Sequence, residues 1–139
     1  MRQALHRLQI HTKHKGLVEI TTQVSAWAER QKITAGLLTI FCRHTSASLL
    51  IQENADPDVR ADLERFFDTI APEDGERHIH RTEGPDDMPA HIKAALTQTQ
   101  LAIPVASGRL VLGTWQGIYL FEHRRAPHPR EIVLHLLGE

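Results

Sequence analysis

Apolar residues follow strand spacing at both ends of the chain and helical spacing in its middle. Near the N-terminus, residues 4–12 and 17–21 are expected to form strands around a turn at His14-Lys15-Gly16. The nearly continuous apolar run GLLTIFCR (36–43) has the length of a strand, and SASLLIQE (46–53) looks like its neighbour in a sheet. The C-terminal part predicts further strands at 101–105, 109–115, 117–123 and 130–137.

The most regular helical pattern begins at Asp56-Pro57. Asp56 can cap this helix, Pro57 suits its first turn, and Pro72 marks its end. One apolar stripe runs along the helix and predicts the face that packs on the core. It consists of Val59, Leu63, Phe66, Phe67 and Ile70.

Two other segments are expected to be helical. Residues 22–31 have helical spacing with Thr21 or Thr22 as N-cap, and a short helix is expected from Pro89 through Leu96. No repeat, low-complexity tract or linker divides the chain, so residues 1–139 are predicted to form a single domain. Helices in the middle and strands at both ends favour an α+β domain over a βαβ repeat.

Composition places the chain among ordinary globular proteins, with 41% apolar and 24% charged residues. A formal net charge of −1 gives no electrostatic reason to expect nucleic acid or an anionic membrane as partner. Cys42 is the only cysteine, so an internal disulfide is excluded, which suits a reducing compartment. The first residues lack the apolar core of a signal peptide, and no apolar run approaches the ~20 residues of a membrane span. We therefore expect a soluble, cytoplasmic protein.

Histidine is the residue type in clear excess, with ten in the chain. His44 ends a buried-looking strand, while His80 and His91 flank the acidic segment EGPDD (83–87), which is followed by Met88-Pro89. Three neutral imidazoles from three elements could form a facial metal site with open positions. His78 would face away from His80 in an extended segment. The spacing alone also fits a solvated loop, because it contains no His-x-x-x-His or Cys-x-x-Cys signature.

The acids of this segment have a supporting role in the metal hypothesis. Glu83, Asp86 and Asp87 are expected mostly to orient imidazole N–H groups or to cap the helix that follows. The remaining histidines are better explained by surface or edge positions. These are His6, His11, His14, His128 and His135.

Two further groups of residues are candidates for chemistry. Glu53 and Asn54 lie where a strand ends and a helix begins, a common place for ligand contacts, although capping by Asp56 competes for this segment. Trp115-Gln116 forms the tip of an expected hairpin, where the indole could pack at an interface or stack on a ligand ring. Arg124 could bind a phosphate, although a surface ion pair with a nearby glutamate would also explain it.

Taken together, three segments closely resemble the YjbQ family, often described as secondary thiamine-phosphate synthase. They are HTSASLLIQENADPDVRADLERF, EGPDDMPAHIKAAL and GRLVLGTWQGIYLFEHR, in the family's order and spacing over nearly the whole chain. The resemblance implies a compact α+β domain with a β-sandwich-like core, a homotrimer, and a histidine-lined cleft near the subunit contacts.

The resemblance also implies functional roles for individual residues. The family's histidines fall on the expected metal ligands His44, His80 and His91. Its Glu-Asn-x-Asp falls on the expected catalytic residues Glu53, Asn54 and Asp56. Substrate-binding roles are expected for Thr45, Ser46, Trp115, Gln116 and Arg124. Two positions depart from the family pattern, because His78 and His123 stand where an aromatic residue is usual.

The resemblance implies transfer of a hydroxymethylpyrimidine group from its diphosphate to a thiazole phosphate. Departure of diphosphate is normally helped by Mg²⁺, which prefers oxygen ligands, whereas three imidazoles suit Zn²⁺ or a similar divalent ion. A second hypothesis is a metal-dependent hydrolase of a phosphate or amide, with Glu53 as general base. A third is a trimer that binds a metabolite without catalysis.

Overall fold

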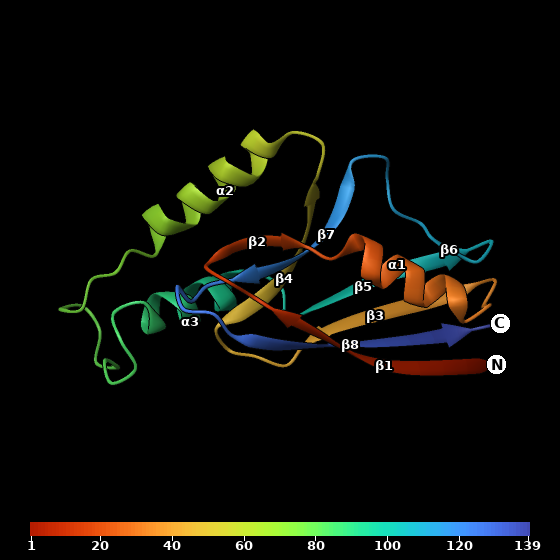
Figure 1. The fold of residues 1–139 in the computed structure, drawn as a ribbon, viewed down its shortest axis with the longest axis horizontal. Helices are drawn as coiled ribbons and strands as arrows, with labels where there is room; N and C mark the ends of the chain where they lie inside the picture. The colour runs from red at the N-terminus through yellow and green to blue at the C-terminus, as the bar shows by residue number, and fades with distance from the viewer.

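The computed structural model describes residues 1–139, which form two antiparallel β-sheets and three α-helices (Figure 1). The strands are β1 (Arg2–His11), β2 (Gly16–Glu19), β3 (Gly36–Cys42), β4 (Ala47–Glu53), β5 (Gln100–Ala106), β6 (Arg109–Leu110), β7 (Gln116–Glu122) and β8 (Pro129–Gly138). The helices are α1 (Thr21–Arg30), α2 (Pro57–Ile70) and α3 (Asp87–Leu96). One sheet has the order β1-β8-β3-β5-β6 and the other β2-β7-β4.

The core lies between the two sheets, because the strands alternate apolar residues toward it. In β3 and β8, the side chains of Leu38, Ile40, Leu134 and Leu136 are fully buried. Residues of both sheets and of α1 belong to one cluster of 18 buried apolar side chains. An isolated bridge between Leu49 and Gln98 joins β4 to the segment before β5. The predicted single α+β domain with a two-sheet core is therefore confirmed.

The outer face of the five-stranded sheet carries exposed apolar side chains. Leu37 pairs directly with Leu137, and Phe41 pairs with Val133. Leu5 of β1 pairs with His135, which lies on the same face as Leu137 because the two are separated by one residue. The exposed large apolar residues on this face are Leu5, Leu37, Phe41 and Leu137.

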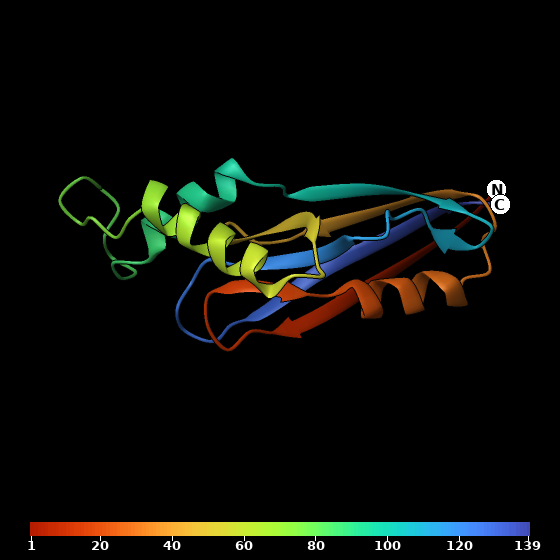
Figure 2. The same ribbon diagram turned by 90° about the horizontal axis from the view of Figure 1, so that it is seen from above.

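Helices α2 and α3 and the loop between them gather at one end of the molecule, while both termini lie at the other end (Figure 1). Seen from above, α2 runs along the smaller sheet (Figure 2). Its residues Leu63 and Phe67 pack on Tyr119 and Phe121 of β7. No helix combines the length and the apolar character that crossing a membrane requires.

The strand and helix predictions differ from the structure at three places. The predicted strand 109–115 is only two residues long, because Gln116 Oε1 accepts from Gly113 N–H and turns the chain before β7. The Thr21 side chain does not cap α1, because its hydroxyl donates to Glu19 Oε2 and accepts from Ile118 N–H. Helix α3 begins at Asp87, two residues before Pro89.

We expect Gly36→Ala to lower the free energy of unfolding by about 1–3 kcal/mol, the usual effect of overpacking. Gly36 pairs with Gly138 where β3 meets β8, and an added Cβ would overlap the carbonyl oxygen of Leu137. Urea denaturation measures the change. Gly75→Ala is the control, because an added Cβ there meets nothing within 4 Å. Equal stability of the two variants would contradict the close approach of these strands.

Candidate metal centre

The acidic segment and the first turns of α3 bring four potential ligands together. Asp87 and His91 are four residues apart and so lie on one face of α3. The loop before the helix adds His80 and Glu83. One ligand atom from each of these four residues lies within 4.8 Å of every other. The segment therefore forms a compact group of two imidazoles and two carboxylates.

Asp87 is the centre of this group. Its Oδ2 lies 2.7 Å from His80 Nε2 and 3.0 Å from His91 Nε2. Glu83 is more distant, with a carboxylate oxygen 3.9 Å from His80 Nε2. The side chain of Asp87 is only 2% exposed, whereas both imidazoles reach solvent. One buried carboxylate thus connects two accessible imidazoles.

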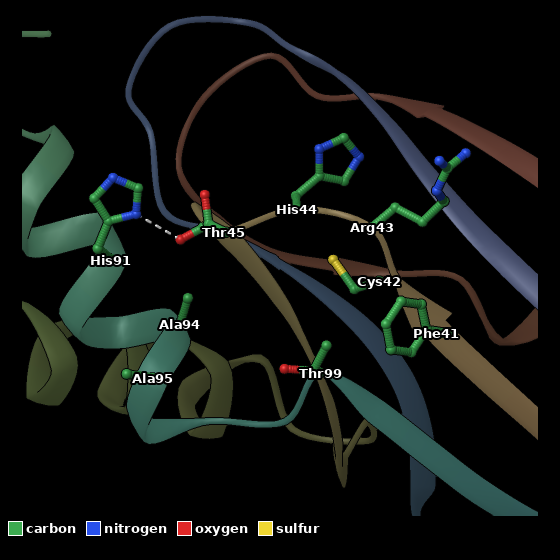
Figure 3. A pocket seen from close by; sticks show the side chains of 9 residues that line it. All are labelled: Phe41, Cys42, Arg43, His44, Thr45, His91, Ala94, Ala95 and Thr99. Carbon is green, nitrogen blue, oxygen red and sulfur yellow. Dashed lines mark hydrogen bonds between the residues drawn. The ribbon is translucent and has the colours of Figure 1, made fainter.

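The tautomer of His91 follows from its other hydrogen bond. Its Nδ1 lies 2.8 Å from the carbonyl oxygen of Thr45, drawn as a dashed line in Figure 3. A carbonyl oxygen only accepts, so Nδ1 carries the hydrogen and donates it. In the neutral ring, Nε2 then presents its lone pair to Asp87 Oδ2. Two acceptors 3.0 Å apart need a positive charge between them, either a proton on the ring or a metal ion.

The donor set fits a divalent metal ion. In a tetrahedral zinc site with bonds of about 2.0–2.1 Å, neighbouring ligand atoms lie about 3.3 Å apart. The Asp87–His91 distance of 3.0 Å is near this value, whereas the Asp87–His80 distance of 2.7 Å is that of a hydrogen bond and would have to lengthen around an ion. A carbonyl that fixes the tautomer of a ligating imidazole is the usual second partner of such a histidine. His80, Asp87 and His91 are therefore suited to hold the ion, with Glu83 as the nearest additional oxygen donor.

Arg124 fixes the carboxylates of this centre. Its Nη1 donates to Asp87 Oδ1 at 2.7 Å, its Nε donates to Asp86 Oδ2 at 3.2 Å, and its Nη2 donates to the carbonyl oxygen of Glu83 at 2.8 Å. Burial alone would raise the pKa of Asp87, but its bond to His80 and the charges of His91 and Arg124 lower the pKa below its usual value. All three nitrogens of Arg124 thus make hydrogen bonds within the chain, and the guanidinium orients Asp87.

A cavity of about 580 Å³ adjoins the centre and is lined by both His44 and His91 (Figure 3). It lies between α3 and the ends of β3 and β5, where Ala94, Ala95 and Thr99 supply small side chains. Such a volume lies in the range of small-molecule sites. The centre therefore stands at the edge of a space that can hold a substrate.

His44 lies in the cavity wall but not in the four-residue group. Its Nε2 accepts from the backbone N–H of Glu131 at 2.7 Å. Burial, with a further contribution from Arg130, lowers the pKa of His44, so the ring is neutral at pH 7. A neutral ring whose Nε2 accepts carries its hydrogen on Nδ1. Within one chain, His44 is thus placed as a hydrogen-bond donor rather than beside the expected ligands His80 and His91.

The other expected site residues divide between the two ends of β4. Thr45 and Ser46 precede the strand on the side of the centre, and Ser46 Oγ accepts from Arg130 at 3.0 Å. Glu53 ends the seven-residue strand, roughly 20 Å away at the usual rise per residue. The expected catalytic residues of this segment and the Trp115-Gln116 tip therefore lie far from the imidazoles of the same chain.

At that far end, most of the polar groups satisfy one another. Asn54 Nδ2 donates to Glu19 Oε2 at 2.9 Å, and Glu53 Oε2 accepts from Asp56 N–H at 3.1 Å. Asp56 caps α2 by accepting from Asp58 N–H, as the capping alternative predicted. Trp115 remains 61% exposed and makes its one backbone bond to Asn54.

Sequence reasoning assigned Asp87 and Glu83 to supporting roles, whereas the structure places their oxygens among the potential ligand atoms. The four-residue spacing between Asp87 and His91 was the available signal, since it puts both side chains on one face of a helix. That signal depends on α3 beginning at Asp87, and the sequence suggested a start at Pro89.

Comparison with known proteins places the chain in a family. The family described as UPF0047 protein YjbQ-like matches residues 6–139. The chain belongs to this family. The chain is 54% identical to a UPF0047 protein of Synechocystis over 138 residues, which cover 99% of this chain and 94% of that protein. It is 44% identical to the UPF0047 protein YjbQ of Escherichia coli O157:H7, over 95% of this chain and 96% of the relative.

Solved structures of similar proteins share the fold. An uncharacterised YjbQ/UPF0047 protein of Clostridium acetobutylicum is 34% identical, with a TM-score of 0.87 over 95% of this chain and 99% of that one. A protein of unknown function from Sulfolobus solfataricus is 26% identical, with a TM-score of 0.86 over 99% of this chain and 100% of that one. The predicted YjbQ membership is confirmed.

Proposed function

We propose that this UPF0047 protein is a metal-dependent enzyme that acts on a small molecule bound in the cavity beside α3. The observation that supports it most directly is the position of Asp87 Oδ2 between two imidazole nitrogens, one of which has its lone pair fixed toward it. The group adjoins a cavity of substrate size, because His91 belongs to the group and also lines the cavity. A bound ion would act there as a Lewis acid.

The donor set widens the choice of metal. Two imidazoles with one or two carboxylates suit Zn²⁺, and this mixed set also accommodates Mn²⁺ or Fe²⁺. Mg²⁺ prefers an oxygen-only set, which these residues do not provide. We therefore propose a zinc-like ion, held by His80, Asp87 and His91.

Thiamine-phosphate synthesis is the narrower proposal and depends on the family resemblance. Its substrates carry phosphates, and the guanidinium that lines the cavity belongs to Arg43, not Arg124. Arg43 pairs with Glu131 at 3.1 Å and is about half-exposed, so a substrate phosphate can compete for it. Neutral His44 would donate to the substrate from the same wall. Hydrolysis of a phosphate ester is the second candidate, because a Lewis-acid centre beside an open cavity also suits it.

The function is tested by turnover with Zn²⁺ or Mn²⁺ added to chelator-treated protein. One reaction contains hydroxymethylpyrimidine diphosphate with thiazole phosphate, and the other contains a panel of phosphate monoesters. We expect turnover in one of them, lost in His91→Ala and retained in His128→Ala, a surface histidine far along the chain. Metal-independent turnover, or full activity of His91→Ala, would contradict the proposal.

We further propose that the protein is a homotrimer that buries the outer face of its five-stranded sheet. Leu5, Leu37 and Leu137 expose apolar surface on that face. Leu5→Asp is expected to yield monomers by light scattering, because a carboxylate would be buried without a partner. Phe66→Asp on α2 is the control, since Phe66 is also exposed but lies on another surface. A trimer in both variants would place the interface elsewhere.

Assembly would also decide the role of the segment at the far end of β4. Glu53 and Trp115 are too distant from His91 to share a substrate within one chain, as the length of β4 shows. They can take part in the same reaction only if another subunit brings them to the cavity. Restoration of activity on mixing Glu53→Gln with His91→Ala subunits would support such shared sites, since some sites would then be intact.

A further inference from the structure

A buried ion pair is hydrogen-bonded to two segments that carry the metal centre. Glu122, the last residue of β7, is fully buried, and Arg130 of β8 is only 4% exposed. Arg130 Nε donates to Glu122 Oε1 at 2.8 Å, and Arg130 Nη2 donates to Glu122 Oε2 at 2.5 Å. Neither residue belongs to the group of potential ligands or lines the cavity beside it.

Stability alone does not require a buried ion pair. Taking two charges out of water costs about as much as their attraction returns, so apolar residues of similar volume often replace such a pair without loss. An apolar pair cannot make hydrogen bonds to its neighbours. Glu122 and Arg130 both make such bonds outside the pair, and these bonds lead to the two sides of the metal centre.

The bonds of Arg130 lead to His91. Arg130 Nη2 donates to the carbonyl oxygen of Ser46 at 3.2 Å and to Ser46 Oγ at 3.0 Å. The preceding residue, Thr45, has the carbonyl oxygen that lies 2.8 Å from His91 Nδ1. The peptide group between Thr45 and Ser46 is planar, so a fixed Ser46 restricts the direction of the Thr45 carbonyl. Arg130 thus supports the hydrogen bond that sets the tautomer of His91.

The loop 43–46 depends on such bonds, because it lies between β3 and β4 and belongs to no helix or strand. Further bonds to it come from residues next to the ion pair. His123 N–H donates to the carbonyl oxygen of Ser46 at 3.3 Å, and Glu131 N–H donates to His44 Nε2 at 2.7 Å. The strands that carry the ion pair therefore hold this wall of the cavity.

The bonds of Glu122 lead to Asp87. Glu122 Oε2 accepts from the backbone N–H of Arg124 at 3.1 Å. The guanidinium of Arg124 donates to Asp87 Oδ1 at 2.7 Å and to the carbonyl oxygen of Glu83 at 2.8 Å. The same Oε2 atom also accepts from Arg130 Nη2. One buried oxygen atom therefore connects the bonds that lead to both sides of the centre.

The two sets of bonds meet where Asp87 Oδ2 lies 3.0 Å from His91 Nε2. One set orients the carboxylate, and the other orients the imidazole. We infer that the Glu122–Arg130 pair positions the metal centre by holding the groups that orient these two ligands. This inference rests on the proposed metal centre, and the pair itself contacts neither ion nor substrate.

The double variant Glu122→Leu/Arg130→Met separates positioning from stability. It removes one negative and one positive charge, so the net charge of the region is unchanged and a change in metal affinity reports geometry. Two apolar residues are expected to keep most of the stability of the pair. We expect Zn²⁺ to bind about 10-fold more weakly than to the wild-type protein, the lower end of the effect of residues behind metal ligands. Chelator competition measures the affinity.

Arg130→Lys is a second variant, which keeps the positive charge beside Glu122. Lysine has one nitrogen in place of the fork of arginine, so it cannot bind both Glu122 oxygens and Ser46 in the same geometry. Its affinity for Zn²⁺ should also fall. Gly36→Ala is the control, because it is expected to lose stability with the ion pair intact. A similar loss of Zn²⁺ affinity in Gly36→Ala, or wild-type affinity in both ion-pair variants, would overturn the inference.

A measurement without metal distinguishes failure of this inference from failure of the proposed centre. The Nδ1–H hydrogen of His91 is bonded to Thr45, so it should exchange slowly with water and give a resolved NMR signal in the metal-free wild-type protein. The signal should be lost in both ion-pair variants and retained in Gly36→Ala. A wild-type protein that binds no Zn²⁺ would refute the metal centre. A signal that persists in both ion-pair variants would refute the positioning role alone.

Discussion

Asp87→Asn is expected to release most of the metal from the centre while leaving the protein folded. The asparagine carbonyl can still accept from Arg124, and its NH₂ group then faces His80 and His91 in place of the ligating oxygen. A change behind a metal ligand typically lowers affinity by about 10- to 100-fold. Because Asp87 would supply a ligand atom itself, we expect a loss of at least about 100-fold.

The same measurement ranks the histidines. His80→Ala and His91→Ala should lose metal as strongly as Asp87→Asn, whereas His44→Ala should retain it, because Glu131 N–H occupies His44 Nε2. Metal content by mass spectrometry and chelator competition give the affinities, with His11→Ala and His128→Ala as controls. Loss of metal in His44→Ala would restore the three-histidine set that the sequence predicts. Full metal occupancy in both His91→Ala and Asp87→Asn would show that these residues do not form the metal centre.

The sequence predicted the five-stranded sheet well because its long strands bury one face. Alternation in β3 and β8 is strict, with Leu38, Ile40, Leu134 and Leu136 inside. The strand predicted at 109–115 is too long, because the apolar residues of β6 continue into a segment where Gly113 and Gln116 form a turn. A hydrogen bond between a side chain and the backbone does not change the alternation of apolar and polar residues, so that alternation does not show where the strand ends.

The candidate site was predicted less completely, for a similar reason. Periodicity and spacing place His80 and His91 near each other, but they do not show which ring nitrogen is engaged elsewhere. His44 accepts a hydrogen bond from a backbone N–H that lies 87 residues away in the sequence. Arg124 donates hydrogen bonds to carboxylates that lie 37 and 38 residues away. Such long-range hydrogen bonds decide which polar groups remain available, and local sequence does not encode them.

Arg130→Met is expected to have the largest effect on stability, about 3–5 kcal/mol of unfolding free energy, because it leaves a buried carboxylate without its cation. Glu122 is fully buried, and Arg130 binds both of its oxygens, through Nε at 2.8 Å and Nη2 at 2.5 Å. Thr12 adds a bond at 2.6 Å. Urea denaturation should show a lower midpoint at an unchanged slope. Glu122→Leu in the Arg130→Met background should recover much of the loss, since an apolar pair needs no compensation.

The loss of stability in Arg130→Met is expected to become smaller as the pH falls. Burial would raise the pKa of Glu122, but its bonds to Arg130, Thr12 and the N–H of Arg124 lower it below the usual value. Because the pKa of Glu122 is lower in the folded than in the unfolded protein, its ionised form stabilises the wild-type fold above the unfolded pKa of about 4.3. This stabilisation is lost as the pH falls through the folded pKa. In Arg130→Met, burial prevails and the folded pKa rises above the unfolded one, so acidification through that pKa should reduce the stability deficit relative to the wild type. A deficit that stays constant between pH 7 and pH 4 would show that the lost packing of Arg130, and not the charge of Glu122, determines the effect.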